Sequence, residues 1–106
     1  MITGIVIYSK DPETVWNAFR FANYALAAGD SLKVFLIGSG VEMETLGTDK
    51  FNVAEQSRTF LATGGKIFAC GTCLEIHKVK PSQIYTVGTL KDLYEIVNKS
   101  DKILTF

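Results

Sequence analysis

The sequence is poor in several residue types, and each scarcity excludes a class of protein. Its 106 residues include two cysteines, one histidine, two prolines and one tryptophan. Two cysteines do not make the disulfide framework of a small secreted fold. A single C-x-x-C pair and a single histidine also argue against a closed zinc site within one chain, so we expect no bound metal.

Excess charge and long apolar runs are absent as well. Eleven basic and eleven acidic residues give a formal net charge of zero, and the basic residues do not cluster along the chain, so we expect no nucleic-acid partner. No apolar run approaches the ~20 residues that a membrane span requires, so we expect no membrane partner. Residues 1–8 are apolar but have no basic stretch before them, so we expect no signal peptide and a cytoplasmic location.

The chain does have a regular alternation of strand-like and helix-like segments. Hydrophobic residues make up 47% of it and charged residues 21%, which is typical of a soluble globular protein, and we expect one domain over residues 1–106. Apolar runs rich in β-branched residues predict strands at residues 2–8, 31–37, 66–69, 84–87 and 102–106. Because helical patterns lie between these strands, the predicted fold class is α/β, with a largely parallel sheet of about five strands and helices on both faces.

The first two helices have recognisable boundaries. Asp11 has the character of an N-cap, and Pro12 follows it at the first helical position. Gly29 lies where a left-handed residue ends the same helix. For the second long helix, either Thr48 or Asp49 is the predicted N-cap.

The helical segments differ in length and in apolar surface. Pro81 limits the helix that follows the cysteines to a short one. Thr89 is the predicted cap of the last helix, and its apolar face is formed by Leu90, Leu93, Ile96 and Val97. In the first helix, the apolar surface around Trp16 and Tyr24 is wider than one packed face requires, which favours burial in a homo-oligomer.

The strongest chemical signal is Cys70-Gly71-Thr72-Cys73 at a predicted strand-to-helix corner. Cys70 ends a strand at the edge where open parallel sheets bind ligands, and it begins a helix, whose N–H groups and dipole favour a thiolate. With this spacing, Cys73 can resolve a mixed disulfide formed at Cys70, so thiol–disulfide exchange is one interpretation. The pair can also supply half of a metal site, or either cysteine can pack as a small apolar residue.

Two further features lie near this corner. Gly38-Ser39-Gly40 follows the second strand but lacks the third glycine of a dinucleotide-binding loop, so we interpret it as a tight turn beside the same edge of the sheet. His77 lies about one helical turn beyond the cysteines. It is a candidate proton donor or substrate ligand, and an ordinary surface histidine is the alternative.

Four segments, which together cover nearly the whole chain, form a recognisable pattern. They are the Asp11-Pro12 helix start, residues 34–41, the corner at residues 70–74 and residues 87–93. With these segments the chain resembles the DsrE/DsrF-like family of small sulfur-relay proteins. The resemblance implies a three-layer α/β/α sandwich and a homo-oligomer, commonly a trimer or a hexamer. It also implies partner proteins that donate and accept sulfur.

The resemblance assigns roles to the candidate residues. Family members that carry sulfur use a cysteine at the position of Cys70, which accepts a persulfide and passes it on. We expect Thr72 and the backbone N–H groups from Gly71 to Cys73 to stabilise the anion, and Cys73 to be an accessory or resolving thiol. The turn at residues 38–40 would shape the neighbouring edge, and Gly38, Ser39 and Gly40 are further candidates for binding the anion or the substrate. No metal or organic cofactor is required for this chemistry.

One residue departs from the family pattern, and two other functions remain as alternatives. Related chains often have basic residues after the cysteines, whereas Glu75 adds negative charge where a cation would hold an anionic sulfur species. The first alternative is a non-catalytic oligomeric module whose corner binds a small anion or a partner chain. The second is a C-x-x-C pair that acts as a thiol–disulfide switch.

Overall fold

The fold is built on a five-stranded parallel sheet. The computed structural model describes residues 1–106, and its strands are β1 (Ile2–Ile7), β2 (Ser31–Leu36), β3 (Lys66–Cys70), β4 (Thr86–Gly88) and β5 (Lys102–Thr105). The strands lie in the order β4-β3-β2-β1-β5, and every neighbouring pair is parallel. The predicted α/β class and the predicted parallel sheet are therefore confirmed.

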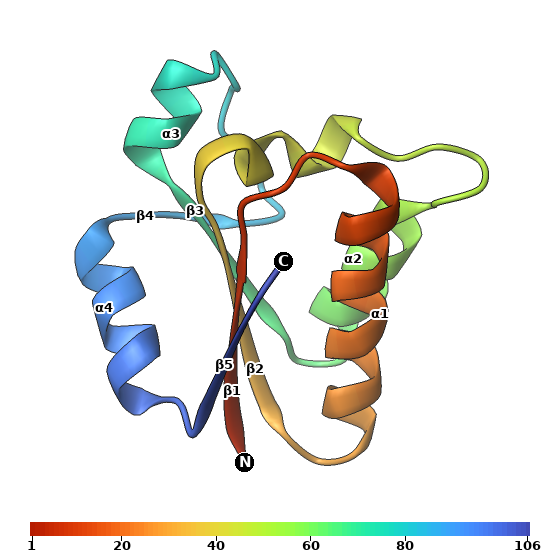
Figure 1. Ribbon diagram of the computed structural model, residues 1–106, viewed down its shortest axis with the longest axis vertical. Helices are drawn as coiled ribbons and strands as arrows, with labels where there is room; N and C mark the ends of the chain where they lie inside the picture. The colour runs from red at the N-terminus through yellow and green to blue at the C-terminus, as the bar shows by residue number, and fades with distance from the viewer.

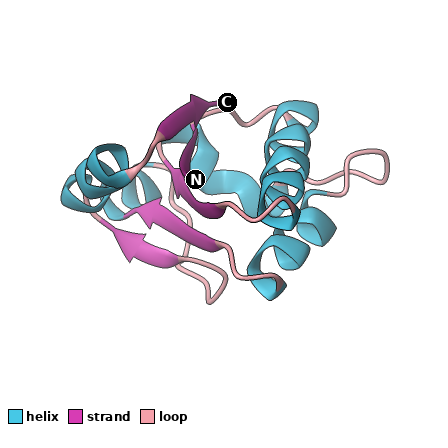
Figure 2. Ribbon diagram, turned by 90° about the horizontal axis from the view of Figure 1, so that it is seen from below, coloured by secondary structure: helices cyan, strands magenta, loops and turns pink.

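Helices cover both faces of this sheet (Figure 1). Helices α1 (Pro12–Ala27) and α2 (Val53–Ala62) pack side by side on one face, and α4 (Leu90–Lys99) covers the other. Helix α3 (Gly71–Ile76) and the 3₁₀ helix η1 (Gly38–Thr45) lie at the edge where the strands end. In Figure 2 the strands lie between two helical layers, which is the expected α/β/α sandwich. None of the helices is both long and apolar enough to cross a lipid bilayer.

The two faces of the sheet are covered unequally. A core of 18 buried residues lies mainly between the sheet and helices α1 and α2. On the α4 side, the buried cluster consists of Phe35, Cys70 and Ile96, because one helix covers only part of a five-stranded sheet. Since burial of apolar area stabilises a fold roughly in proportion to that area, the α4 layer is held less firmly than the other helical layer.

Side-chain alternation along β2 and β3 decides which residues face α4. The register pairs Lys33 with Lys66 and Phe35 with Phe68. Successive residues of a strand point to opposite faces of the sheet. Because Phe35 and Cys70 pack in the cluster beneath α4, Lys33 and Lys66 also lie on the α4 side, nearer the edge where the strands begin.

Helix α1 begins and ends as predicted. Its N-cap is Asp11, whose carboxylate accepts the backbone N–H of Thr14 at 2.9 Å, and Pro12 follows at the first helical position. This hydrogen bond holds the pKa of the Asp11 carboxyl below its ordinary value. Gly29, just past the end, has a φ of +100°, a left-handed conformation that glycine adopts without steric cost.

Helix α2 begins later than predicted. Its N-cap is Asn52, whose side-chain oxygen accepts the N–H of Glu55 at 3.0 Å, so the predicted caps Thr48 and Asp49 are wrong. The Thr48 hydroxyl instead accepts the N–H of Phe51 at 3.0 Å and closes the turn before the helix. Polar residues that can cap a helix also stabilise turns, and here the two roles fall to different residues.

The C-terminal elements differ from prediction in two details. Strand β4 begins after Tyr85, a residue that the prediction placed inside the strand and that the structure buries in the preceding turn. Helix α4 follows Thr89 as predicted. Of its predicted apolar face, however, Ile96 is buried, whereas Leu90 is 65% exposed and Val97 is 46% exposed.

Candidate functional site

The two cysteines meet where β3 ends and α3 begins. Cys70 is the last residue of β3 and the N-cap of α3, with extended backbone angles of φ −62° and ψ 118°. Its Sγ accepts the backbone N–H of Cys73 at 3.4 Å. The sulfur therefore occupies the place that the side-chain oxygen of a serine or aspartate takes in an ordinary N-cap. The predicted strand-to-helix corner, with a short helix after it, is confirmed.

A cavity of about 520 Å³ opens beside both cysteines. Its lining residues come from the ends of β2, β3 and β4 and from the beginnings of α3 and α4, and they are Ile37, Cys70, Gly71, Thr72, Cys73, Val87, Gly88, Thr89 and Leu90. The predicted ligand-binding residues Gly71 and Thr72 thus share a cavity with the thiols. None of the lining side chains is charged, so any anion held here relies on N–H and O–H donors rather than on a cation.

Burial decides the chemical state of Cys73. Removal of this thiol from water raises its pKa, and the adjacent Cys70 thiol raises it further. The backbone N–H of Gly38 acts in the opposite direction, because it donates a hydrogen bond to the sulfur. Cys73 is therefore a neutral thiol at neutral pH, beside the 4% exposed Cys70.

The glycine-containing turn lies on the other side of the cysteines. Gly38 has a φ of +57° and lets the chain turn from β2 directly into η1. Gly40 donates its N–H to the carbonyl oxygen of Ile37 at 3.0 Å, and a Cβ at Gly40 would collide with the carbonyl oxygen of Ile7. Residues 38–40, predicted as a tight turn, form the first turn of η1 at this edge of the sheet, and Ile37 rather than this turn lines the cavity.

The structure does not bring His77 into the cysteine cavity. Its Nδ1 lies 3.1 Å from Oε2 of Glu42, and this pair ties the end of α3 to η1. His77 lines a different cavity, of about 570 Å³, together with Glu42 and Glu44. In this geometry its contribution is to hold α3, and with it the cysteines, against the turn after β2.

Glu75 also lies outside the cysteine cavity. It is exposed, and it lines a neighbouring hollow of about 450 Å³ together with Lys78 and Lys80. Water and these two lysines therefore screen its charge from Cys70. The departure from the family pattern at this position places no carboxylate on the wall of the cysteine cavity.

One wall of the cavity was not predicted from the sequence. Val87 and Leu90 line it together with the cysteines, and Gly88 is the register partner of Cys70. The carboxyl ends of parallel strands meet at one edge of a sheet, and this rule would have pointed to the end of the fourth strand. Which strand lies beside β3 depends on the strand order, which no local pattern contains.

No three His, Cys, Asp or Glu side chains are grouped so that they can hold a metal ion.

Comparison with known sequences gives one family and two relatives. The sequence model of the DsrE/DsrF-like family matches residues 1–106. An uncharacterised protein of Methanopyrus kandleri, MK0008, is 29% identical over 110 residues, which cover 95% of this chain and 91% of that protein. An uncharacterised protein of Methanocaldococcus jannaschii, MJ0989, is 28% identical over 110 residues, which cover 95% and 96%.

Two solved structures have the same fold. The crystal structure of the YchN protein from E. coli superposes with a TM-score of 0.84 at 21% identity and covers 100% of both chains. The structure of BT1422, a conserved protein of unknown function from Bacteroides thetaiotaomicron, superposes with a TM-score of 0.78 at 24% identity and covers 99% of this chain and 94% of that one. At these identities the likeness establishes the α/β/α architecture.

Proposed function

Because the chain belongs to the DsrE/DsrF-like family, we propose that it is a sulfur-relay protein that carries a persulfide on Cys70. The observation that carries the proposal is the position of the Cys70 sulfur. It accepts the N–H of Cys73 while lining a cavity of about 520 Å³, within the range of ~300–1,000 Å³ that suits small molecules.

The proposed reaction is a transfer of sulfane sulfur. The Cys70 thiolate attacks the outer sulfur of a donor such as thiosulfate or a persulfide, and a new S–S bond forms on Cys70. The S–S bond of the donor breaks, and its electron pair leaves with the remaining fragment as sulfite or as a thiolate. The reaction has no need of an external oxidant or reductant, and a second thiolate can remove the sulfur by the same step.

The surroundings of Cys70 suit such an intermediate. The N–H of Cys73 is a donor for the sulfur anion, and Gly71 and Thr72 on the cavity wall are the residues proposed to bind the donor molecule. The apolar residues Ile37 and Val87 give the cavity an apolar wall, and a partner that covers the exposed Val87 would limit the access of water to a reactive persulfide. The neutral Cys73 thiol is the accessory group, positioned to resolve the persulfide or to supply a proton.

Location and partners follow from this chemistry. Both cysteines are free thiols, and the reaction requires Cys70 in the reduced state, so we place the protein in the cytoplasm. Its proposed partners are a sulfur donor, a sulfur acceptor and further copies of the same chain. Val87 and Leu90 line the cavity and are also exposed, so a neighbouring copy would complete its apolar rim.

One observation favours a second candidate function. Cys70 is nearly buried and no cation lines its cavity, which suits a non-catalytic module that binds a small ligand. A thiol–disulfide switch between Cys70 and Cys73 is the related alternative. In the first case the protein would bind a ligand, and in the second its two cysteines would form a disulfide. In neither case would it take up sulfane sulfur.

Intact mass spectrometry after incubation with thiosulfate or polysulfide separates these functions. The parent chain is expected to gain the mass of one sulfur atom and to lose it on treatment with a thiol reductant. Cys70→Ser should abolish the gain, and the matched variant Cys73→Ser should retain it. A parent chain that gains no sulfur from either donor would exclude the relay function, and loss of two hydrogens on oxidation would identify the switch.

A further inference from the structure

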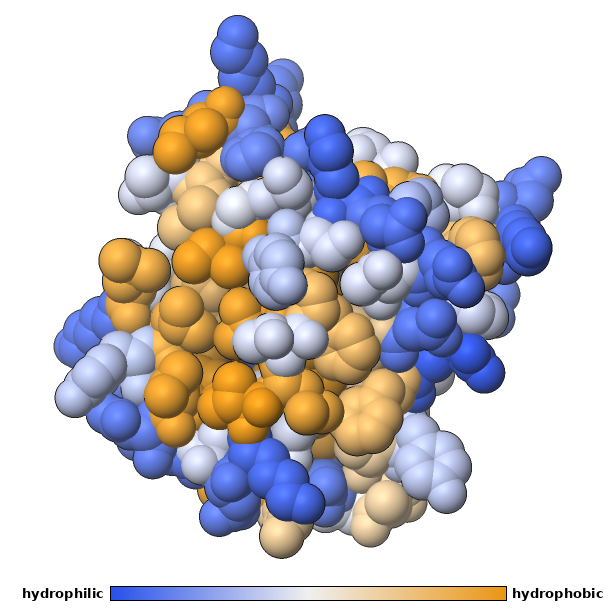
Figure 3. Space-filling view, viewed as in Figure 1, coloured by the Kyte–Doolittle hydropathy of each residue, from blue (hydrophilic) through white to orange (hydrophobic).

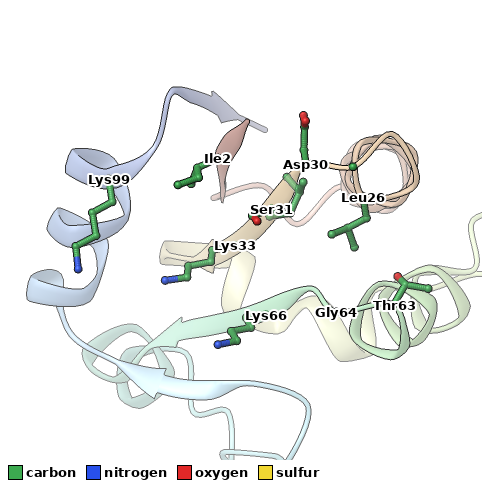
Figure 4. A pocket seen from close by; sticks show the side chains of 11 residues that line it. Ile2, Leu26, Asp30, Ser31, Lys33, Thr63, Gly64, Lys66 and Lys99 are labelled. Carbon is green, nitrogen blue, oxygen red and sulfur yellow. The ribbon is translucent and has the colours of Figure 1, made fainter.

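A second cavity lies at the opposite edge of the sheet, where the strands begin. It has a volume of about 480 Å³ and is bounded by the first residues of β2 and β3 and by the carboxyl ends of α1, α2 and α4 (Figure 4). Because β3 runs from Lys66 to Cys70, this cavity and the cysteine cavity are at opposite ends of the same strand. The two cavities share no lining residue.

Three lysines from three elements surround this cavity. They are Lys33 of β2, Lys66 of β3 and Lys99 in the last turn of α4, and Figure 4 shows the side chains of Lys33 and Lys66 extending toward α4, which carries Lys99. No lysine of this chain takes part in an ion pair, since the two ion pairs are Met1–Asp30 and His77–Glu42. Asp30, the acidic residue on the cavity wall, is thus already occupied by the chain's amino terminus at 3.1 Å.

The arrangement of these lysines is unfavourable for folding. Lys33 and Lys66 are register partners on adjacent strands and project from the same face, and like charges directly opposite each other destabilise a sheet. The next residue in this row is Gly4, where a Cβ would come within 2.6 Å of Ile103 and 2.8 Å of Ile96. This glycine lets the end of α4 pack directly on β1, which brings Lys99 beside the other two lysines.

The positive charge of the three lysines is larger than the negative partial charge of the three helix ends. The carboxyl ends of α1, α2 and α4 each carry a partial negative charge of about half an elementary charge, which lysines commonly neutralise. Three ammonium groups leave an excess of about one and a half positive charges. A phosphate monoester carries about −1.5 to −2 charges at neutral pH, and lysine binds phosphate as a point charge. Ile2 supplies an apolar part of the wall on the face of the sheet that carries Lys33 and Lys66.

We propose that this cavity binds a phosphate monoester, with the phosphate held by Lys33, Lys66 and Lys99 and the organic group placed against Ile2, which lies on the same face of the sheet as Lys33. Free inorganic phosphate shares the same charge chemistry but lacks the apolar group. The three lysines lie far apart in the sequence, and the parallel register and the packing of α4 bring them together.

Isothermal titration calorimetry on the full chain at fixed ionic strength tests the proposal with phenyl phosphate and inorganic phosphate as probes. Both are expected to bind saturably, and phenyl phosphate more tightly. Lys33→Gln and Lys66→Gln should each weaken binding by about two- to fivefold, and the double variant by about tenfold. Lys10→Gln removes the same charge after the far end of β1 and should leave the affinity unchanged.

Thermal unfolding supplies a second readout. Without phosphate, Lys66→Gln should melt at a higher temperature than the parent chain, because the variant removes the repulsion from Lys33. Phosphate should raise the melting temperature of the parent and have a smaller effect on the variant. The proposal is overturned if the parent shows no saturable binding of either probe, or if Lys10→Gln loses as much affinity as Lys66→Gln. Equal affinities for phenyl phosphate and inorganic phosphate would overturn the proposed contact with the organic group and leave inorganic phosphate as the ligand.

Discussion

The sulfur of Cys70 occupies the N-cap position of α3, where serine, threonine, aspartate or asparagine is usual. A thiol sulfur is a weak hydrogen-bond acceptor, so its 3.4 Å contact with the N–H of Cys73 stabilises α3 less than an oxygen cap would. Burial beside Phe35 and Ile96 acts in the opposite direction, because a thiol is less costly to bury among apolar side chains than a hydroxyl.

The raised pKa of Cys73 predicts a loss of stability in alkaline solution. In the unfolded chain this thiol ionises near ~8.5, whereas burial keeps it protonated to higher pH in the folded chain. Above the unfolded pKa the folded state binds more protons, so the free energy of unfolding falls as the pH rises through the folded pKa. Urea denaturation at a series of pH values measures this slope. Cys73→Ser should have a shallower slope over the same range, and an unchanged slope would contradict the assignment.

The position of Glu75 predicts a weak effect on sulfur uptake. Since Glu75 is exposed and shares its hollow with Lys78 and Lys80, screening reduces its interaction with Cys70. Glu75→Lys should change the initial rate of persulfide loading from thiosulfate by less than about fivefold. Mass spectrometry of samples quenched at successive times gives that rate, with Glu55→Lys on α2 as the charge-matched control. A much larger acceleration by Glu75→Lys alone would show that the carboxylate opposes the anion.

At the scale of elements, local chemistry made some boundaries predictable and others not. Asp11 followed by Pro12 leaves little choice of helix start, and the structure has the cap there. For α2, Thr48, Asp49 and Asn52 all suit a cap, and the helix begins where Val53 can enter the core at 1% exposure. That choice depends on packing against distant residues, which a local pattern does not contain.

The candidate site, too, was predictable from the sequence only in part. The corner around Cys70 is local and was predicted, because a strand, two cysteines and a helix follow one another directly. The opposite wall at Val87 and Leu90 exists only because β4 lies beside β3. The meeting of Lys33 with Lys66 depends equally on the parallel register, so the basic residues are dispersed in sequence and close in space.

The turn after β2 tolerates no side chain at Gly40. A Cβ there would collide with the backbone carbonyl of Ile7, which is held in the sheet and cannot move aside. Gly40→Ala should therefore destabilise the fold by about 1–3 kcal/mol, the range of overpacking. The matched variant Gly47→Ala meets nothing closer than 3.4 Å and should cost less than about 1 kcal/mol. Urea denaturation of both variants compares the two costs, and equal costs would contradict this explanation.

At the scale of the whole molecule, much apolar surface is left uncovered. Apolar side chains gather over α4 and the sheet edge beside it in Figure 3. Along α4, Leu90, Tyr94 and Val97 form an exposed stripe at helical spacing, and it continues to the mouth of the cysteine cavity. On α1, Tyr24 is 77% exposed, whereas the neighbouring Trp16 is covered by Arg20.

We predict a homo-oligomer in which a second copy covers the α4 stripe. Burial of such a stripe is favourable, and a trimer or a hexamer is the expected assembly. Multi-angle light scattering at micromolar protein concentration should give a mass well above that of one chain. Tyr94→Lys should reduce that mass, whereas Tyr24→Lys on α1 serves as the matched aromatic-to-lysine control and should not. A monomeric parent chain would contradict the prediction, and dissociation by Tyr24→Lys alone would move the interface to α1.

The unequal cores on the two faces of the sheet affect how the buried thiol of Cys70 becomes accessible. Beneath α4 only three residues form the buried cluster, and Cys70 is one of them. Hydrogen–deuterium exchange should therefore be faster for the amides of α4 than for those of α1, through transient detachment of α4 that leaves the rest folded. Each detachment would uncover Cys70, so low urea concentrations should accelerate sulfur loading before the molecule unfolds. Equal exchange in α4 and α1 would mean that the layers unfold as one and that the thiol is reached through its cavity alone.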